Sequence, residues 1–408
     1  MNILKNILTN NLYAISLYSR QIAGTIVLFI IARYLSIYDY GLFTSYKSII
    51  TFCFMFANME YSNYILVSSQ ANIKEVKLKI ALFLVNAILI GFFIAFFSYF
   101  FKLENHLLFT LIIIRTFFDS IFFGLILPYF QATKTFNNIA KINIIYSFCI
   151  SLIAIISYIF KLSLVKFLLL NIGLGVINFI QCSYFAKINY LLVFTYIKRF
   201  IRMIDKSIYG YIGSTISDYL YAQTSSLYVA TFLPKEQAAL YFSANTIAMM
   251  VGLLSAAQTQ KMLPDLIKSD IENIKKILKK NLVVVGAILS FILLLITLFG
   301  KLILKLLYGQ DYYTNAYPIL LIYFIANIFI ANGAIFGIYL TAINKQYIKI
   351  KLKLETTIVT ILGLIALHKF GVYGAVTALL ISAIYVSTRF TMYSLRFIKN
   401  GECYEKQI

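Results

Sequence analysis

The sequence predicts an all-α integral membrane protein with about twelve transmembrane helices and both termini in the cytoplasm. The 408 residues are 61% hydrophobic and only 12% charged, whereas soluble globular domains are about one quarter charged. Apolar runs of about 20 residues, the length that crosses about 30 Å of hydrocarbon as a helix, recur along the whole chain. Lys and Arg gather in alternate loops between these runs, and this bias sets the orientation.

Twelve apolar runs are long enough to span a membrane. The first follows Lys5, contains Arg20 and Arg33 and lacks a small-residue cleavage site, so it predicts a retained helix and not a removed signal peptide. The span at 207–233 is the most polar. The predicted spans are 12–35, 42–67, 79–101, 107–131, 141–160, 166–186, 207–233, 239–263, 282–307, 316–343, 351–368 and 372–398.

Basic residues decide the orientation of these spans. Of the 36 Lys and Arg residues, 24 lie on the side that carries both termini, eight lie in the opposite loops, and four lie within spans. Cytoplasmic loops carry such an excess, so both termini are predicted to be cytoplasmic. The net charge of +21 therefore needs no nucleic-acid partner.

Cysteine and histidine usage indicates no metal, haem or redox site, and no cofactor is expected. The four cysteines lack Cys-x-x-Cys spacing, and His106 and His368, which both lie beside short loops, are the only histidines. The outer loops are all short. A membrane glycan polymerase or ligase, one alternative class, needs a sizeable outer loop for its chemistry, so a non-enzymatic protein is favoured.

The segment LPDLIKSDIENIKKILKKN, Leu263 to Asn281, is both amphipathic and basic. Its apolar residues recur at intervals of three and four, as on one face of a helix. Two interpretations stay open: a helix that lies on the anionic inner leaflet, and a helical connector with a solvated basic face. The apolar positions are Leu263, Ile267, Ile271, Ile274 and Leu278.

Two phrases recur at an offset of 198 residues. ARYLSIYDYGLFTSYKSI begins at Ala32, ATFLPKEQAALYFSANTI begins at Ala230, and they share five identities in eighteen positions. Each phrase lies between the first two spans of a six-span half, as in transporters built from two parallel repeats. The sequence therefore predicts a lobe at 1–200 with a cytoplasmic linker, a lobe at 201–398, and a tail at 399–408.

Four motifs at predicted turns are distributed over nearly the whole chain. Gly41, in the first of them, is expected to let the chain turn tightly into the second span. The motifs are ARYLSIYDYGLF with Arg33, Tyr40 and Gly41; YFQATKTFNNIAKI from Tyr129; LLYGQDYYTNAYPIL with Gly309, Tyr312 and Ala316; and HKFGVYGAVTALLIS with Gly371, Gly374 and Ala375.

These motifs resemble those of the polysaccharide and O-antigen repeat-unit flippases, a branch of the multidrug, oligosaccharidyl-lipid and polysaccharide exporter superfamily. The resemblance implies two six-helix lobes around a central cavity. It also implies a flippase that moves an undecaprenyl-diphosphate-linked oligosaccharide from the inner to the outer leaflet of a bacterial inner membrane. Such a flippase would feed lipopolysaccharide or capsule synthesis beside a polysaccharide polymerase. Many relatives carry an Asp midway along the seventh helix, and here either Asp218 or Gln223 aligns with it.

A diphosphate cargo requires cations within the spans. Inserting a charged residue into a span costs about 2.5 to 3.5 kcal/mol, so each such residue is a candidate for a function. Arg20 lies about 12 Å into the first span, and its guanidinium fork suits phosphate oxygens. Lys47 heads a polar stripe with Thr51, Asn58 and Ser62. For both cations the alternative to a cargo contact is a side chain that snorkels to the membrane surface.

The other two candidate cargo contacts lie on polar helix faces. Arg115 precedes Asp119 by four residues, so the two are expected to pair on one face. The pair would either hold helices together permanently or open when a phosphate or a proton arrives. Arg389 follows Ser382 and Tyr385 on one face of the last span.

Three acids are the candidates for coupling to protons or sodium ions: Asp119, Asp218 and Glu60. Asp218 lies near the middle of the seventh span, where a carboxylate is either paired with an arginine or able to carry a proton. A drug exporter of the same superfamily would bind cations and should present an acidic cavity. The excess of cations over acids within the spans favours the flippase.

Overall fold

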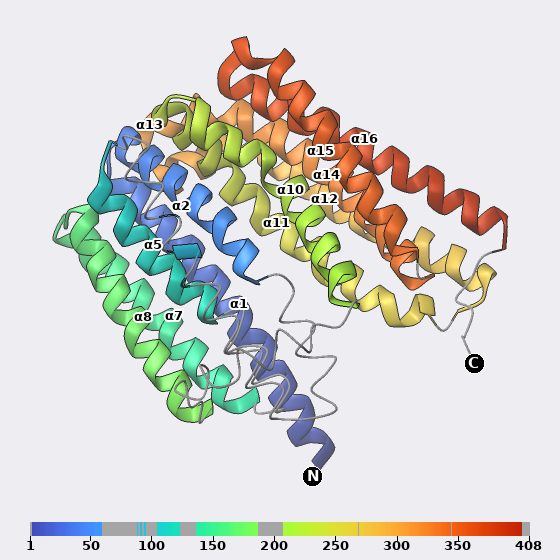
Figure 1. Ribbon diagram of the computed structural model, residues 1–408, viewed down its shortest axis with the longest axis horizontal. Helices are drawn as coiled ribbons and strands as arrows, with labels where there is room; N and C mark the ends of the chain where they lie inside the picture. The colour runs from blue at the N-terminus through green and yellow to red at the C-terminus, as the bar shows by residue number, and fades with distance from the viewer. Residues whose placement is uncertain are drawn as a thin grey trace. The chain divides into compact units, whose positions relative to one another are not determined.

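The computed structural model of the protein describes residues 2–58, 88, 90–91, 94, 104–122, 136–186, 207–267, 269–343 and 345–401 (Figure 1). Across these ranges the chain is helical between short turns and contains no β-strand. The all-α prediction is therefore confirmed for this part of the chain. Five described helices are long and apolar enough to cross a membrane, at Asn138–Ile159, Leu164–Phe185, Ile271–Tyr308, Ala316–Ala342 and His368–Lys399.

Twelve spans and cytoplasmic termini stay predictions. The predicted span at 79–101 lies almost entirely outside the described residues, as does the linker at 187–206 that contains the predicted lobe boundary. The structure instead divides into two compact units. Unit 1 comprises Met1–Ser36 and Tyr46–Ile216, and unit 2 comprises Ile37–Ser45 and Ser217–Ile408.

Unit 1 is built on a long first helix. This helix, α1 (Asn2–Tyr34), packs along α7 (Phe136–Ile159), and α8 (Leu164–Ala186) contacts both α7 and α5 (His106–Ile121). The N-terminus of α5 is capped by Asn105, whose side chain accepts a hydrogen bond of 2.9 Å from the backbone N–H of Leu108. The larger part of α2 (Ile37–Asn58) also belongs to this unit.

Unit 2 surrounds a central helix, α14 (Ala316–Ala342), which packs against α11, α12 and α16. Because α14 is apolar on all sides, it is stable only where neighbours cover it. The other helices are the larger part of α10 (Ser207–Phe232), which enters this unit at Ser217, and α11 (Lys235–Ile267), α12 (Ile271–Tyr308), α13 (Gln310–Tyr313), α15 (Gln346–Ala366) and α16 (Gly371–Lys399), with a 3₁₀ turn at His368–Phe370.

The repeat of 198 residues is visible in the helix boundaries. α1 ends at Tyr34 and α10 ends at Phe232, while α2 begins at Ile37 and α11 begins at Lys235. Both pairs of boundaries differ by the offset that the two phrases showed. The repeated phrases thus encode the same structure, a helix end followed after two residues by a new helix.

Gly41 has a different role from the one expected. It lies inside α2 and does not have a positive φ, so no tight turn requires it. A Cβ at this position would lie only 1.7 Å from the carbonyl oxygen of Lys235. The glycine is needed because α2 passes directly against the start of α11 within unit 2. Beside it, the buried ring of Tyr40 contacts Tyr308 and Tyr312 edge to face.

Candidate functional site

Arg20 lies in the interior of unit 1, between side chains of two other helices. Its guanidinium carbon is 3.5 Å from the ring centroid of Phe122 and 3.9 Å from that of Tyr146. Its Nη1 donates a 3.4 Å hydrogen bond to Oδ1 of Asn143. Only 6% of the residue is exposed. Two aromatic faces therefore hold the cation in place, and it does not snorkel.

A single carboxylate is shared between two arginines. Asp119 Oδ1 lies 2.9 Å from Nη1 of Arg115 and 3.6 Å from Nη2 of Arg20. Arg115 also donates to the hydroxyl of Tyr146. The pairing that the four-residue spacing predicted is confirmed, and Arg20 joins it from a second helix. We call Arg20, Arg115, Asp119, Asn143 and Tyr146 the arginine cluster.

The exposure of the arginine cluster is uneven. The side chains of Arg20 and Arg115 are 5% and 13% exposed, but that of Asp119 is 38% exposed. Counted over these five described residues alone, two guanidiniums and one carboxylate give a formal charge of +1. Because the carboxylate is the accessible member, an anion or a proton that arrives there would meet Asp119 first.

Lys47 adds a third cation near the arginine cluster. Its side chain is exposed on α2, and its charge interacts with those of Asp119 and Arg115. The neighbouring Thr51 is partly exposed, as the predicted polar stripe requires. The stripe's other two members cannot be placed, because Ser62 and the side chain of Asn58 lie outside the described residues. The coupling candidate Glu60 lies outside them too.

Two ion pairs join helices within unit 2. Asp218 on α10 forms a salt bridge with Lys353 on α15. Glu355, two residues further along α15, lies 3.3 Å from Nη2 of Arg389 on α16 and accepts a 3.0 Å hydrogen bond from the hydroxyl of Tyr385. Each of these two pairs is neutral. Among the described residues compared here, cations therefore outnumber acids in the arginine cluster of unit 1 and not in these pairs.

Sequence reasoning missed both partners in unit 2. It expected an arginine or a proton at Asp218, whereas the partner is a lysine. It named neither Lys353 nor Glu355 among the candidates. A signal was available, because both residues fall inside the apolar run at 351–368, where charges need partners.

The Asp218–Lys353 pair yields a stability prediction. The side chain of Lys353 is 12% exposed and that of Asp218 is 41% exposed. Because removing the carboxylate beside the more buried charge costs more than removing the cation beside the more exposed one, Asp218→Asn should lower the unfolding temperature more than Lys353→Met. The double variant should recover part of the loss, with a coupling of about 1 to 3 kcal/mol. Thermal unfolding of the purified variants measures this, and strictly additive effects would contradict it.

Two serines of α10 form contacts between helices within unit 2. Ser225 donates a 3.4 Å hydrogen bond to the backbone oxygen of Ala375 on α16. The Ser226 hydroxyl lies 3.5 Å from that of Tyr241 on α11. The polarity that marks this span in the sequence is therefore explained in part by bonds between helices.

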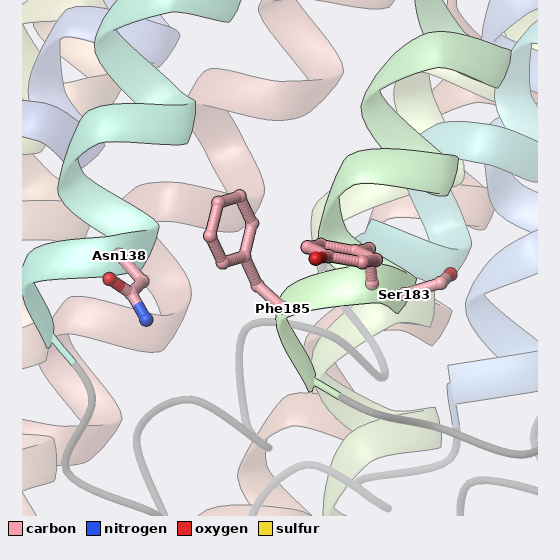
Figure 2. A pocket seen from close by; sticks show the side chains of 4 residues that line it. Asn138, Ser183 and Phe185 are labelled. Carbon is pink, nitrogen blue, oxygen red and sulfur yellow. The ribbon is translucent and has the colours of Figure 1, made fainter.

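A surface pocket of about 550 Å³ lies where α7 begins and α8 ends (Figure 2). Asn138 enters it from α7, and Ser183, Tyr184 and Phe185 enter it from α8. These four side chains carry no charge. Among the described residues, the lining of this pocket thus offers no cation to an anionic cargo, in contrast to the arginine cluster of the same unit.

No protein-family model and no curated protein sequence matches the chain. Solved structures do match it, and over nearly its whole length. They are transporters of the MOP superfamily, the superfamily that the turn motifs resemble. At the identities involved, this likeness establishes the fold.

Three of these structures illustrate the likeness. The lipid II flippase MurJ in an inward closed conformation has a TM-score of 0.74 at 14% identity, covering 94% of this chain and 87% of that one. An inward-facing multidrug-resistance MATE transporter has a TM-score of 0.70 at 13% identity, covering 93% and 95%. A Pyrococcus furiosus transporter, described by the reverse polarity of its binding pocket, has a TM-score of 0.60 at 12% identity, covering 95% and 94%.

Proposed function

We propose that this protein is a flippase that moves an undecaprenyl-diphosphate-linked oligosaccharide from the inner to the outer leaflet of the bacterial inner membrane by alternating access. The observation that carries the proposal is the arginine cluster, whose described members include two largely buried cations and one partly exposed acid. The fold shared with a lipid II flippase supports it. In this proposal the product feeds a surface polysaccharide such as O-antigen or capsule, through a polymerase partner.

The physical reason is the cost of bringing a diphosphate into hydrocarbon. Phosphate oxygens accept charge-assisted hydrogen bonds, and the planar fork of arginine matches their geometry. Arg20 and Arg115 both lie against the Asp119 carboxylate, so a diphosphate that took the place of this carboxylate would meet two guanidiniums at once. We assign the first diphosphate contact to these two arginines, with Lys47 beside them. Arg389 stays a proposed contact in unit 2, where Glu355 is its partner.

Asp119 links cargo binding to an ion in this proposal. A diphosphate that approached Arg20 and Arg115 would compete with the carboxylate for both guanidiniums. Protonation of Asp119 would release them. Asp119 is therefore the favoured site for proton coupling. Sodium coupling, and a role for Asp218 or Glu60, are the alternatives. Transport measured in imposed proton or sodium gradients distinguishes them.

A multidrug exporter is the alternative within the same fold, since MATE transporters are among the matching structures. Binding an organic cation needs an unneutralised carboxylate. In the described residues Asp119 faces two arginines, and Asp218 and Glu355 each have a cation of their own. This charge pattern favours an anionic cargo.

Deletion of the protein in its host tests the function directly. We expect a completed undecaprenyl-linked oligosaccharide to accumulate on the cytoplasmic leaflet while the surface glycan disappears. Analysis of extracted lipid-linked intermediates, with and without enzymatic access from the outer face, measures both effects. Complementation with the wild-type chain is the control.

Two other results would each indicate a different function. Unchanged surface glycan together with new drug sensitivity would contradict the flippase and favour the exporter. Chemical turnover of a lipid-linked glycan by the purified protein would contradict both transport functions and favour a membrane polymerase or ligase.

A further inference from the structure

Helix α12 is much longer than a membrane span. Its 38 residues extend about 57 Å at 1.5 Å per residue, whereas the hydrocarbon layer is about 30 Å thick. The stretch 282–300 contains no charged residue and covers about 28 Å of this length. Residues 271–281 therefore continue the same helix beyond the hydrocarbon, at the end predicted to be cytoplasmic.

Four lysines occupy one side of this extension: Lys275, Lys276, Lys279 and Lys280, here called the lysine face. At 100° per residue they fall within an arc of about 140°. All four are exposed, while Ile274 on the opposite side is 1% exposed and packs into unit 2. Along the helix axis the lysines lie about 3 to 10 Å from Leu282, at the depth of lipid headgroups.

The lysine face is not neutralised by the described part of the protein. No carboxylate there forms an ion pair with any of the four lysines. Lys275 with Lys279, and Lys276 with Lys280, are like charges four residues apart, an arrangement that destabilises a helix unless anions screen it. Glu272 is the one acid in the extension. The geometry therefore favours an external anionic partner.

Exposed apolar side chains show which kind of partner fits. Val283, Phe291, Leu294 and Leu298 are 54% to 64% exposed and lie on the same side of α12 as the lysine face. The cationic surface thus continues directly into a surface suited to acyl chains. A soluble acidic protein would match only the cationic surface. We propose that the lysine face binds the headgroups of anionic phospholipids, whose acyl chains lie against the apolar strip below it.

Native mass spectrometry of the purified full chain tests this. Phosphatidylglycerol and phosphatidylcholine with the same acyl chains are the probes. Each lysine near an anionic surface contributes about 1 kcal/mol, roughly a fivefold change in affinity. We expect a preference for phosphatidylglycerol in the wild type and a loss of at least about tenfold in that preference when all four lysines become glutamine.

Matched variants and a salt titration separate charge from structure. Changing the four lysines to arginine should keep the preference, as should Lys301→Gln at the other end of α12. Added salt should weaken the wild-type preference, which tests the proposal even where the glutamine variant does not fold. An unchanged preference in a folded glutamine variant would overturn it. Displacement of phosphatidylglycerol by undecaprenyl diphosphate at equal concentration would also overturn it and assign the lysine face to cargo.

Discussion

Replacing Arg20 with alanine is expected to reduce transport of the proposed cargo, a lipid-linked oligosaccharide, at least tenfold while the protein accumulates to its normal level. A charge-assisted hydrogen bond contributes about 1.5 to 3 kcal/mol, which corresponds to roughly ten- to more than a hundredfold in binding. The remaining pair of Arg115 and Asp119, 2.9 Å apart, keeps the neighbouring charges compensated. The loss should therefore lie in function more than in folding.

Arg20→Lys sharpens this prediction. Lysine keeps the charge but loses the fork that suits phosphate and the flat surface that lies against Phe122 and Tyr146. Partial recovery of transport is expected. Arg33→Ala is the matched control, because Arg33 is exposed near the end of the same helix. Surface glycan and membrane protein level are measured together for each variant, and full activity of Arg20→Ala would remove Arg20 from the site.

Gly41→Ala is expected to prevent accumulation of the folded protein. The added Cβ would lie 1.7 Å from the carbonyl oxygen of Lys235 and 2.5 Å from its carbonyl carbon. Both atoms belong to the backbone, so no side chain can rotate away, and α2 would have to separate from α11. Losses above about 4 kcal/mol arise from such steric conflicts. Membrane protein level and unfolding temperature are the measurements.

Gly24→Ala provides the control for this substitution. Gly24 lies in α1, and a Cβ there meets nothing within 4 Å. Because alanine favours helix more than glycine does, this variant should be as stable as the wild type or slightly more stable. A Gly41→Ala protein with the wild-type unfolding temperature would show that α2 and α11 do not need their close approach.

Helix content and local pairing followed from the sequence because both depend on neighbours along the chain. Arg115 and Asp119 are four residues apart on one helix, so their salt bridge could be predicted before the helix was placed. The recurrence of one phrase after 198 residues likewise predicted two similar helix junctions, which α1–α2 and α10–α11 form.

Pairing between helices could not be predicted in this way. Asn143 is 123 residues from Arg20, and Lys353 is 135 residues from Asp218. Helical periodicity shows which side of a helix is polar, but not which neighbour that side meets. For the same reason Gly41 was explained by a turn, although the oxygen that requires it belongs to Lys235.

By itself, the sequence determined that this is a helical membrane protein, that its charges within the spans are few, and which of them lie close together along one helix. These properties depend on composition and on a period of 3.6 residues. Only the tertiary structure decided that Arg20 and Arg115 share Asp119, and that Asp218 is neutralised by Lys353. The net charge at a site is set by which helices pack together, and packing brings together residues that are far apart in the chain.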